Sequence, residues 1–275
     1  MKKSCLRKII SLIMVASNLV LLSCSSDEYK TENSKITISG STSVGPLMEK
    51  MAEDFEKLNE GVVIEVNQTG SSAGIKDVID GVSKIGMSSR DLSVDEEGKV
   101  EGIVMAYDGI AVIVNNENPI INISKEEVKD IFTGKITNWK DVGGEDSEIV
   151  VVSREDGSGT RAAFEEIVEY KAKDLVRDAL ISDGSGNIKV IISQNKHAIG
   201  FISFEYLDQS VKALEVDNVK ATAENVIESR YPISRGYLMV VDKTNLSDID
   251  TKFIEWILSD NGQDLVQSYG SIKIR

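Results

Sequence analysis

The sequence predicts an α/β fold with a mostly parallel sheet, and three observations support this prediction. From Lys35 onward, short β-branched segments alternate with segments whose apolar residues recur every three or four positions. Several of the strand-like segments run into Ser, Thr and Gly clusters, which are typical of the turn before a helix. The 275 residues are 41% hydrophobic, enough for a sizeable core. Strands that alternate with helices usually form a parallel sheet that the helices cover.

The first set of elements follows a βαβα order. Residues 35–40 alternate between polar and apolar side chains as a strand does, and the helix that follows has apolar residues at Leu47, Met51, Phe55 and Leu58. We interpret this stripe as core and not as a cofactor site. The predicted strands are residues 35–40, 62–67, 85–88 and 103–114, and the predicted helices are residues 44–58 and 73–79.

A second set of elements begins at Ser124. This serine precedes a helical pattern that runs to Phe132, and Glu127 three residues later completes the signature of a capping box. Two helices, beginning near Ser247 and Asn261, end the chain. The predicted strands are residues 148–152, 199–204, 211–216 and 236–241, and residues 160–170 form a predicted helix.

The first 34 residues are predicted to lie outside the fold. Basic residues at positions 2, 3, 7 and 8 precede an apolar run over residues 9–22. A helix of this length rises about 1.5 Å per residue and is too short for a roughly 30 Å hydrocarbon core, so residues 1–23 are typical of a secretion signal. The run ends in Leu21-Leu22-Ser23-Cys24, which resembles a bacterial lipobox and predicts lipidation of Cys24. Residues 24–34 would then form a lipid-anchored tether to the cell membrane.

Charge and cysteine usage exclude several functions. The formal net charge is −14, and loss of residues 1–23 removes four positive and no acidic residues, which lowers it to −18. This charge disfavours binding to nucleic acid or to an anionic membrane surface, so an anion must be held by local donors. The only cysteines, Cys5 and Cys24, precede the predicted fold, so we expect no disulfide, thiol nucleophile or cysteine metal site.

Four clusters of Ser, Thr and Gly follow predicted strands. A helix N-terminus presents unpaired N–H groups and a positive dipole end, which suits an oxyanion. Arg154 adds a planar guanidinium that matches phosphate oxygens. Each cluster alone is more simply a set of helix caps, but junctions of this kind gather at the carboxyl edge of an open α/β sheet, where ligands bind. The clusters are residues 40–43 (GSTS), 70–74 (GSSAG), 88–90 (SSR) and 154–160 (REDGSGT).

The ordered motifs resemble those of the phosphate-binding component of the bacterial phosphate ABC importer. The resemblance extends over essentially the whole chain after the signal, and includes ITISGSTSVGPL, GSSAG, SKIGMSSRDL, IFTGKITNWKDVGG, REDGSGT and AIGFISFEYL. It implies a type II periplasmic-binding-protein fold, in which two α/β lobes joined by a two-strand hinge close over inorganic phosphate. Lobe 1 would comprise residues 35–111 and 231–275, and lobe 2 residues 112–230. Delivery of the phosphate to permease subunits of an ABC importer is also implied.

The resemblance further implies which residues bind phosphate. Arg154 would be the charged clamp, oriented by Asp156, and neutral donors would come from the starts of helices in both lobes. The implied phosphate-binding residues are Thr42, Ser43, Ser71, Ser89, Arg154, Ser158, Gly159 and Thr160.

One position departs from the family pattern. Ser89 stands where many members carry an aspartate that accepts the proton of hydrogen phosphate. A carboxylate repels fully ionised sulfate, whereas a hydroxyl can donate or accept and repels neither anion, so we expect weaker discrimination against sulfate. Arg90, the next residue, is either a further ligand or a solvent-facing side chain.

Enzymatic functions have less support in the sequence. Ser158 lies in DGSGT, which is not the G-x-S-x-G motif of hydrolases, and His197 lies in a polar stretch that predicts a surface turn. We therefore expect no catalytic residue, no cofactor and no bound metal, in a monomer that contacts the membrane only through its lipid. The alternative function is an anchored phosphate or sulfate sensor or scavenger without a transporter. A phosphatase is a third possibility, but the sequence offers neither metal ligands nor a base for it.

Overall fold

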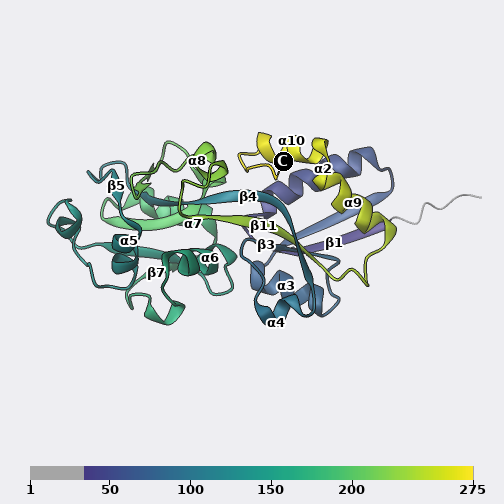
Figure 1. Cartoon of the computed structure of the whole chain (residues 1–275), viewed down its shortest axis with the longest axis horizontal. Coiled ribbons are helices and arrows are strands. Elements are labelled where there is room, and N and C mark those ends of the chain that lie inside the picture. The colour runs from purple at the N-terminus through teal and green to yellow at the C-terminus, as the bar shows by residue number, and fades with distance from the viewer. Residues whose placement is uncertain (1–33, 275) are drawn as a thin grey trace, which may run out of the picture. The chain divides into compact units, whose positions relative to one another are not determined.

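The computed structural model describes residues 34–274 (Figure 1). The predicted signal, the Cys24 anchor and residues 25–33 of the predicted tether lie outside the described residues. Among the helices of residues 34–274, none combines the length and the apolar character that crossing a bilayer requires.

The strands and helices alternate along the chain, as the sequence predicts. The strands are β1 (Ser34–Gly40), β2 (Val62–Gln68), β3 (Ile85–Ser88), β4 (Glu101–Val114), β5 (Asn122–Ile123), β6 (Val150–Arg154), β7 (Leu180–Ser182), β8 (Ala198–Ser203), β9 (Lys212–Ala213), β10 (Glu215–Val216) and β11 (Ser234–Val241). The helices are α2 (Gly45–Leu58), α3 (Ser71–Ile79), α4 (Val94–Glu97), α5 (Lys125–Phe132), α6 (Gly159–Val168), α7 (Gly184–Gln194), α8 (Ala223–Ile227), α9 (Asp248–Leu258) and α10 (Asp260–Ser268). Short 3-10 helices are η1 (Trp139–Val142), η2 (Ala172–Asp174) and η3 (Phe204–Tyr206).

One mixed sheet carries most of the strands. Its order is β2-β1-β3-β11-β4-β8-β6-β7, with β9 paired to β4, and β5 and β10 form a separate pair. At one end β1 runs parallel to β2 and β3, and at the other end β6 runs parallel to β7 and β8. Between them, β11 is antiparallel to β3 and β4, and β4 is antiparallel to β8. The predicted α/β class is therefore confirmed.

Buried side chains gather into two main groups. The first surrounds β1 and β3 and contains Phe55 of α2, whose ring meets that of Phe253 of α9 edge-on at 4.9 Å. The second surrounds β8 and contains Phe164 of α6, stacked on Phe201 at a centroid distance of 4.0 Å. Truncating a buried Phe to Ala typically costs about 3–5 kcal/mol, so each group is a substantial source of stability.

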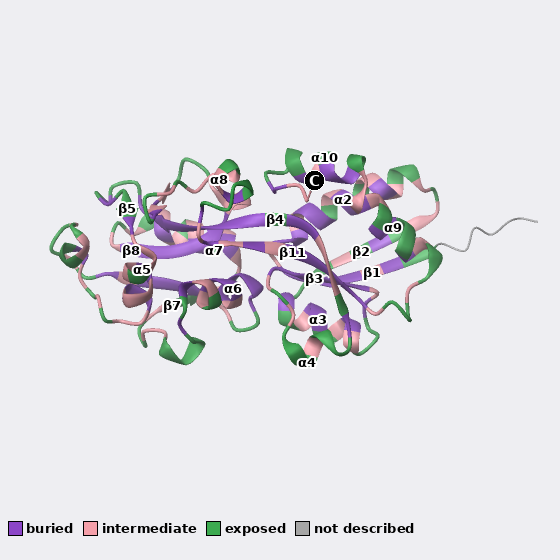
Figure 2. Ribbon diagram, in the orientation of Figure 1, coloured by how far each residue is buried: buried purple, intermediate pink, exposed green. Residues whose placement is uncertain are grey.

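Strands β4 and β11 link these two groups. Met105 of β4 and Tyr237 of β11 pack in the first group, whereas Val112 of β4 and Ile233, the residue just before β11, pack in the second. Figure 2 shows buried residues along β4 and β8 in the interior of the sheet. We call β1–β3, α2, α3, α9 and α10 the first half, and α5–α7, β6–β8 and η3 the second half (Figure 1).

Several local predictions are confirmed and one is wrong. Ser124 caps α5 and forms the predicted capping box with Glu127. The helix predicted over residues 160–170 ends at Val168, because Glu169 adopts a left-handed backbone with φ 66°. The single strand predicted over residues 211–216 is instead β9 and β10, which pair with β4 and β5 respectively. The chain changes partner at the buried Leu214 and so cannot remain one straight strand.

Candidate anion-binding site

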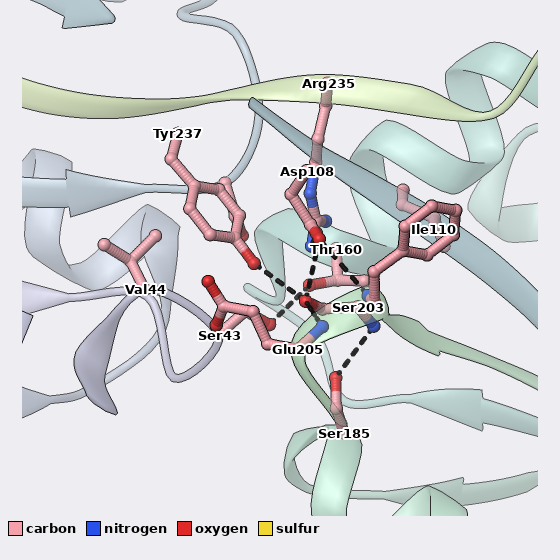
Figure 3. A network of polar contacts seen from close by, with 12 residues as sticks. Ser43, Val44, Asp108, Ile110, Thr160, Ser185, Ser203, Glu205, Arg235 and Tyr237 are labelled. Atoms are coloured by element: carbon pink, nitrogen blue, oxygen red, sulfur yellow. Dashed lines mark hydrogen bonds and ion pairs between the residues drawn. The ribbon is translucent and has the colours of Figure 1, made fainter. Parts of the chain in front are cut away.

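Four strand ends bring the Ser, Thr and Gly clusters together. The loops after β1 and β3 and the N-termini of α3 and α6 all contribute. The carboxyl ends of β1, β2 and β3 share one edge of the sheet because these strands are parallel, whereas β6 runs in the opposite direction and brings its loop to them from the second half. The hydroxyls of Ser43 and Thr160 lie 2.9 Å apart although 117 residues separate them (Figure 3). Arg154 donates from Nη2 to the hydroxyl of Thr42 at 3.0 Å. The sequence-predicted residues from both halves therefore meet in one place.

The first half contributes a buried group of hydroxyls. Ser41 Oγ donates to Ser89 Oγ at 2.9 Å, and Ser89 Oγ lies 3.3 Å from Ser71 Oγ. The N–H of Ser89 donates to Ser71 Oγ at 3.1 Å, and the N–H of Ser43 donates to Ser41 Oγ at 3.2 Å. All four serines are buried. Because hydroxyls can donate or accept, this group can turn neutral donors toward an oxyanion without adding charge.

The second half contributes the N-terminus of α6. Ser158 is its N-cap and accepts from the N–H of Arg161 at 3.2 Å, and Gly159 and Thr160 form its first turn. A Cβ added at Gly159 would lie 2.2 Å from Ser71 Oγ, so only glycine allows this close approach of the two halves. The free N–H groups and the positive dipole end of α6 therefore point toward the hydroxyls of the first half.

Arg154 supplies the positive charge of the site. The side chain is 1% exposed, and its Nε and Nη2 each donate to a carboxylate oxygen of Glu155 at 2.7 Å. Burial is the largest single influence and acts to raise the pKa of Glu155, but the hydrogen bonds and charge of Arg154, together with backbone hydrogen bonds, hold that pKa below its usual value. Nη1 is buried and has no hydrogen-bond partner among residues 34–274. A buried N–H without a partner is costly, which favours a ligand that accepts from it.

The orientation of Arg154 corrects one expectation. Asp156, which the resemblance implies as its partner, is fully exposed and accepts instead from Arg161 Nη1 at 2.8 Å. Arg161 also binds Glu165 and donates from Nη1 to the carbonyl of Arg154 at 3.1 Å. Glu155 therefore orients the guanidinium of Arg154, and Asp156 stabilises the loop behind it.

The structure also decides the role of Arg90. Its two terminal nitrogens donate to the carboxylate oxygens of Glu96 at 2.8 and 2.9 Å. These hydrogen bonds are the main reason that the pKa of Glu96 falls to about 2. Arg90 Nη2 also lies 3.3 Å from the hydroxyl of Ser72 at the start of α3. Arg90 is thus not solvent-facing, and it does not point at the buried serine hydroxyls of the site. It holds the loop after β3 in place.

Features of other kinds of site are not found in the described part of the chain. Residues 34–274 contain no group of three or more His, Cys, Asp or Glu side chains placed to bind a metal ion. His197 lies in a turn before β8, as predicted, where its carbonyl accepts from Trp139 Nε1 at 2.9 Å.

Comparison with known proteins places the chain in a family. A family model described as the PBP superfamily domain matches residues 25–261, and the fold is that of the periplasmic binding proteins, as predicted. The phosphate-binding protein PstS of Bacillus subtilis (strain 168) is 35% identical over 295 residues, covering 100% of this chain and 95% of that protein. PstS of Borreliella burgdorferi is 30% identical over 282 residues, covering 98% and 100% respectively. The chain belongs to this family of phosphate-binding proteins.

Solved structures agree with this assignment. A Clostridium perfringens protein solved with bound phosphate is 53% identical, has a TM-score of 0.85 and covers 88% of this chain and 100% of its own. An ABC-type phosphate transport receptor from Vibrio cholerae is 36% identical, has a TM-score of 0.78 and covers 87% and 100% respectively.

Proposed function

We propose that the chain binds inorganic phosphate between its two halves, outside the cytoplasm, and delivers it to the permease of an ABC importer. The observation that carries this proposal is Arg154, a buried guanidinium whose Nη1 has no partner among residues 34–274, at the meeting point of hydroxyls from both halves. The names of the relatives, phosphate-binding proteins and a phosphate transport receptor, support the same ligand.

The proposed site binds an anion in a strongly acidic protein through local donors. Arg154 contributes one full charge, and the remaining donors are the proposed ligands Thr42, Ser43, Ser71, Ser89, Ser158, Gly159 and Thr160. A charge-assisted hydrogen bond contributes about 1.5–3 kcal/mol, roughly twice a neutral one. Neutral hydroxyls and N–H groups avoid a surplus of positive charge that would favour more highly charged anions. Phosphate specificity would then depend on the directions of these donors.

Transport requires that the halves move apart and together. We propose that they are the two predicted lobes, and that β4 and β11 are the hinge strands between them. Several hydrogen bonds already cross between the halves, including Ser43 with Thr160 and the N–H of Ser72 with the carbonyl of Gly157 at 3.2 Å. Closure would exclude water from the site and give the permease one defined shape to recognise.

We propose binding without catalysis, and anchoring through Cys24. Glu155 is the carboxylate that contacts Arg154, and it is engaged with that guanidinium and so unavailable as a base. The lipobox-like end of the apolar run in the sequence supports lipidation of Cys24 and a position on the outer face of the cell membrane.

Titration calorimetry tests the proposed function. We expect saturable binding of phosphate and arsenate with one site per chain, and weaker binding of sulfate and molybdate. Phosphate should also raise the unfolding temperature, because only the folded protein binds it. Absence of binding heat and of any stabilisation at millimolar phosphate would contradict the proposal. Phosphate uptake by cells lacking this chain then separates import from sensing, since a sensor's loss would leave uptake intact.

A further inference from the structure

A tyrosine of the second half contacts the main chain of the phosphate site in the first half. Tyr206 is the last residue of η3, the short helix after β8, and its hydroxyl donates to the carbonyl oxygen of Thr42 at 3.2 Å. Thr42 lies in the loop between β1 and α2, 164 positions earlier. Tyr206 is not among the residues that the sequence analysis assigns to the site.

This contact acts on the peptide bond between Thr42 and Ser43, two of the proposed phosphate ligands. The carbonyl of Thr42 and the N–H of Ser43 belong to one planar peptide unit, so fixing the carbonyl also fixes the direction of that N–H. The hydroxyls of the same two residues bind Arg154 and Thr160. Tyr206 therefore adds a third point at which the second half holds the loop of residues 42–43.

The surroundings of Tyr206 make it a rigid donor. Ser203 Oγ accepts from the N–H of Glu205, and the N–H of Phe204 donates to Asp108 Oδ1 on β4 (Figure 3). Glu205 accepts a hydrogen bond from Ser271. Thus η3 is tied both to β4 and to the C-terminal segment.

The hydroxyl of Tyr206 also keeps its proton. Burial, assisted by the nearby carboxyl of Glu205, raises the pKa of Tyr206 to about 12. The residue is therefore a hydrogen-bond donor throughout the physiological pH range. The ring of Tyr206 lies beside Gly186 in the first turn of α7, where an added Cβ would be 3.8 Å from a ring carbon, an ordinary contact distance.

We propose that Tyr206 is a positioning residue of the phosphate site, which orients the Thr42–Ser43 peptide when the halves are together. This inference rests on the proposed function. The inference adds that the hydrogen bond from Tyr206 to the carbonyl of Thr42, which does not involve the anion, helps to hold the two halves together.

The test compares Tyr206→Phe with Tyr170→Phe. Both changes remove one phenolic oxygen, but the buried hydroxyl of Tyr170 has no hydrogen-bond partner among residues 34–274 and belongs to the second core. Loss of a neutral hydrogen bond corresponds to about a two- to tenfold change in an equilibrium constant. We expect Tyr206→Phe to raise the Kd for inorganic phosphate by this factor, mainly through faster dissociation. Tyr170→Phe should leave the Kd unchanged.

A second measurement separates positioning from general destabilisation. In ¹⁵N NMR spectra of the phosphate-bound protein, the Ser43 amide resonance should shift in Tyr206→Phe and stay in place in Tyr170→Phe. Without phosphate, Tyr206→Phe should unfold at the wild-type temperature, and Tyr170→Phe at that temperature or above it, because it removes a buried hydroxyl that has no partner among residues 34–274. A wild-type Kd together with an unmoved Ser43 resonance in Tyr206→Phe would overturn the inference while the proposed function stands. A wild-type protein that does not bind phosphate would overturn both.

Discussion

Replacing Gly159 by alanine tests whether the two halves must come together to bind phosphate. A Cβ at this position would lie 2.2 Å from Ser71 Oγ, 2.8 Å from Ser71 Cβ and 2.7 Å from Ser89 Oγ. Rotating the Ser71 hydroxyl would not relieve the contact with its Cβ, so the halves must stay apart by roughly an ångström to reach ordinary van der Waals distance. Overpacking of this kind costs about 1–3 kcal/mol, which is about five- to more than a hundredfold in Kd.

The effect should appear in binding and not in folding. Alanine is a better helix former than glycine, so Gly159→Ala should unfold without phosphate at the wild-type temperature or slightly above it. Calorimetry measures the Kd, and small-angle scattering reports whether phosphate still compacts the protein. The matched control is Gly98→Ala, because Gly98 has φ −70° and an added Cβ there meets no atom of the described part of the chain within 4 Å. A Gly159→Ala protein that binds phosphate as tightly as Gly98→Ala would refute the reasoning.

The remaining predictions concern the anchor, selectivity and pH. Cys24→Ala should release the protein from the membrane fraction or leave it unprocessed, and equal detergent-phase partitioning of variant and wild type would exclude lipidation. Ser89→Asp should raise the ratio of phosphate to sulfate affinity, since a carboxylate repels an anion that has no proton to share, and a lower ratio would contradict this. Arg90 lowers the pKa of Glu96 to about 2. The ion pair therefore adds to the free energy of unfolding above the ordinary pKa of 4.5, and this contribution is lost as pH falls toward 2. Glu96→Gln should therefore lower the unfolding temperature at pH 7 but not near pH 2, and a constant difference across this range would rule out the ion pair as its source.

The order of elements could be predicted because most helices and strands bury one face, so their apolar residues recur at the spacing of a helix or of a strand. Helix α7 was not predicted, since its residues are rich in Ile and Val and begin with a glycine-rich turn. The signal that could have identified it is the pair Ile188 and Ile192, four positions apart and both fully buried. The division of residues 211–216 into two strands could not be predicted, because it depends on which distant strands each piece pairs with.

The predicted site residues meet because their clusters follow the carboxyl ends of strands in both halves, β1–β3 in the first half and the oppositely directed β6 in the second, and hydrogen bonds such as Ser43 to Thr160 join these ends. The partner of Arg154 was predicted wrongly. Glu155 and Asp156 are neighbouring carboxylates, and only the conformation of the loop decides which of them points toward Arg154. Glu155 faces the guanidinium, whereas Asp156 faces Arg161. Tyr206 lies in the motif AIGFISFEYL, but the sequence could not assign it to the site, because its partner lies in the other half of the protein.

The most direct test of the phosphate-binding account is the Kd of Arg154→Ala. The guanidinium is buried, is oriented by Glu155 and reaches Thr42 across the two halves, so its loss removes the only full positive charge that we assign to the site. Calorimetry should show a Kd at least tenfold above that of the wild type, consistent with about 1.5–3 kcal/mol for one charged hydrogen bond. His197→Ala, a change in the turn before β8, should bind phosphate as the wild type does. An Arg154→Ala protein with the wild-type Kd would contradict the account.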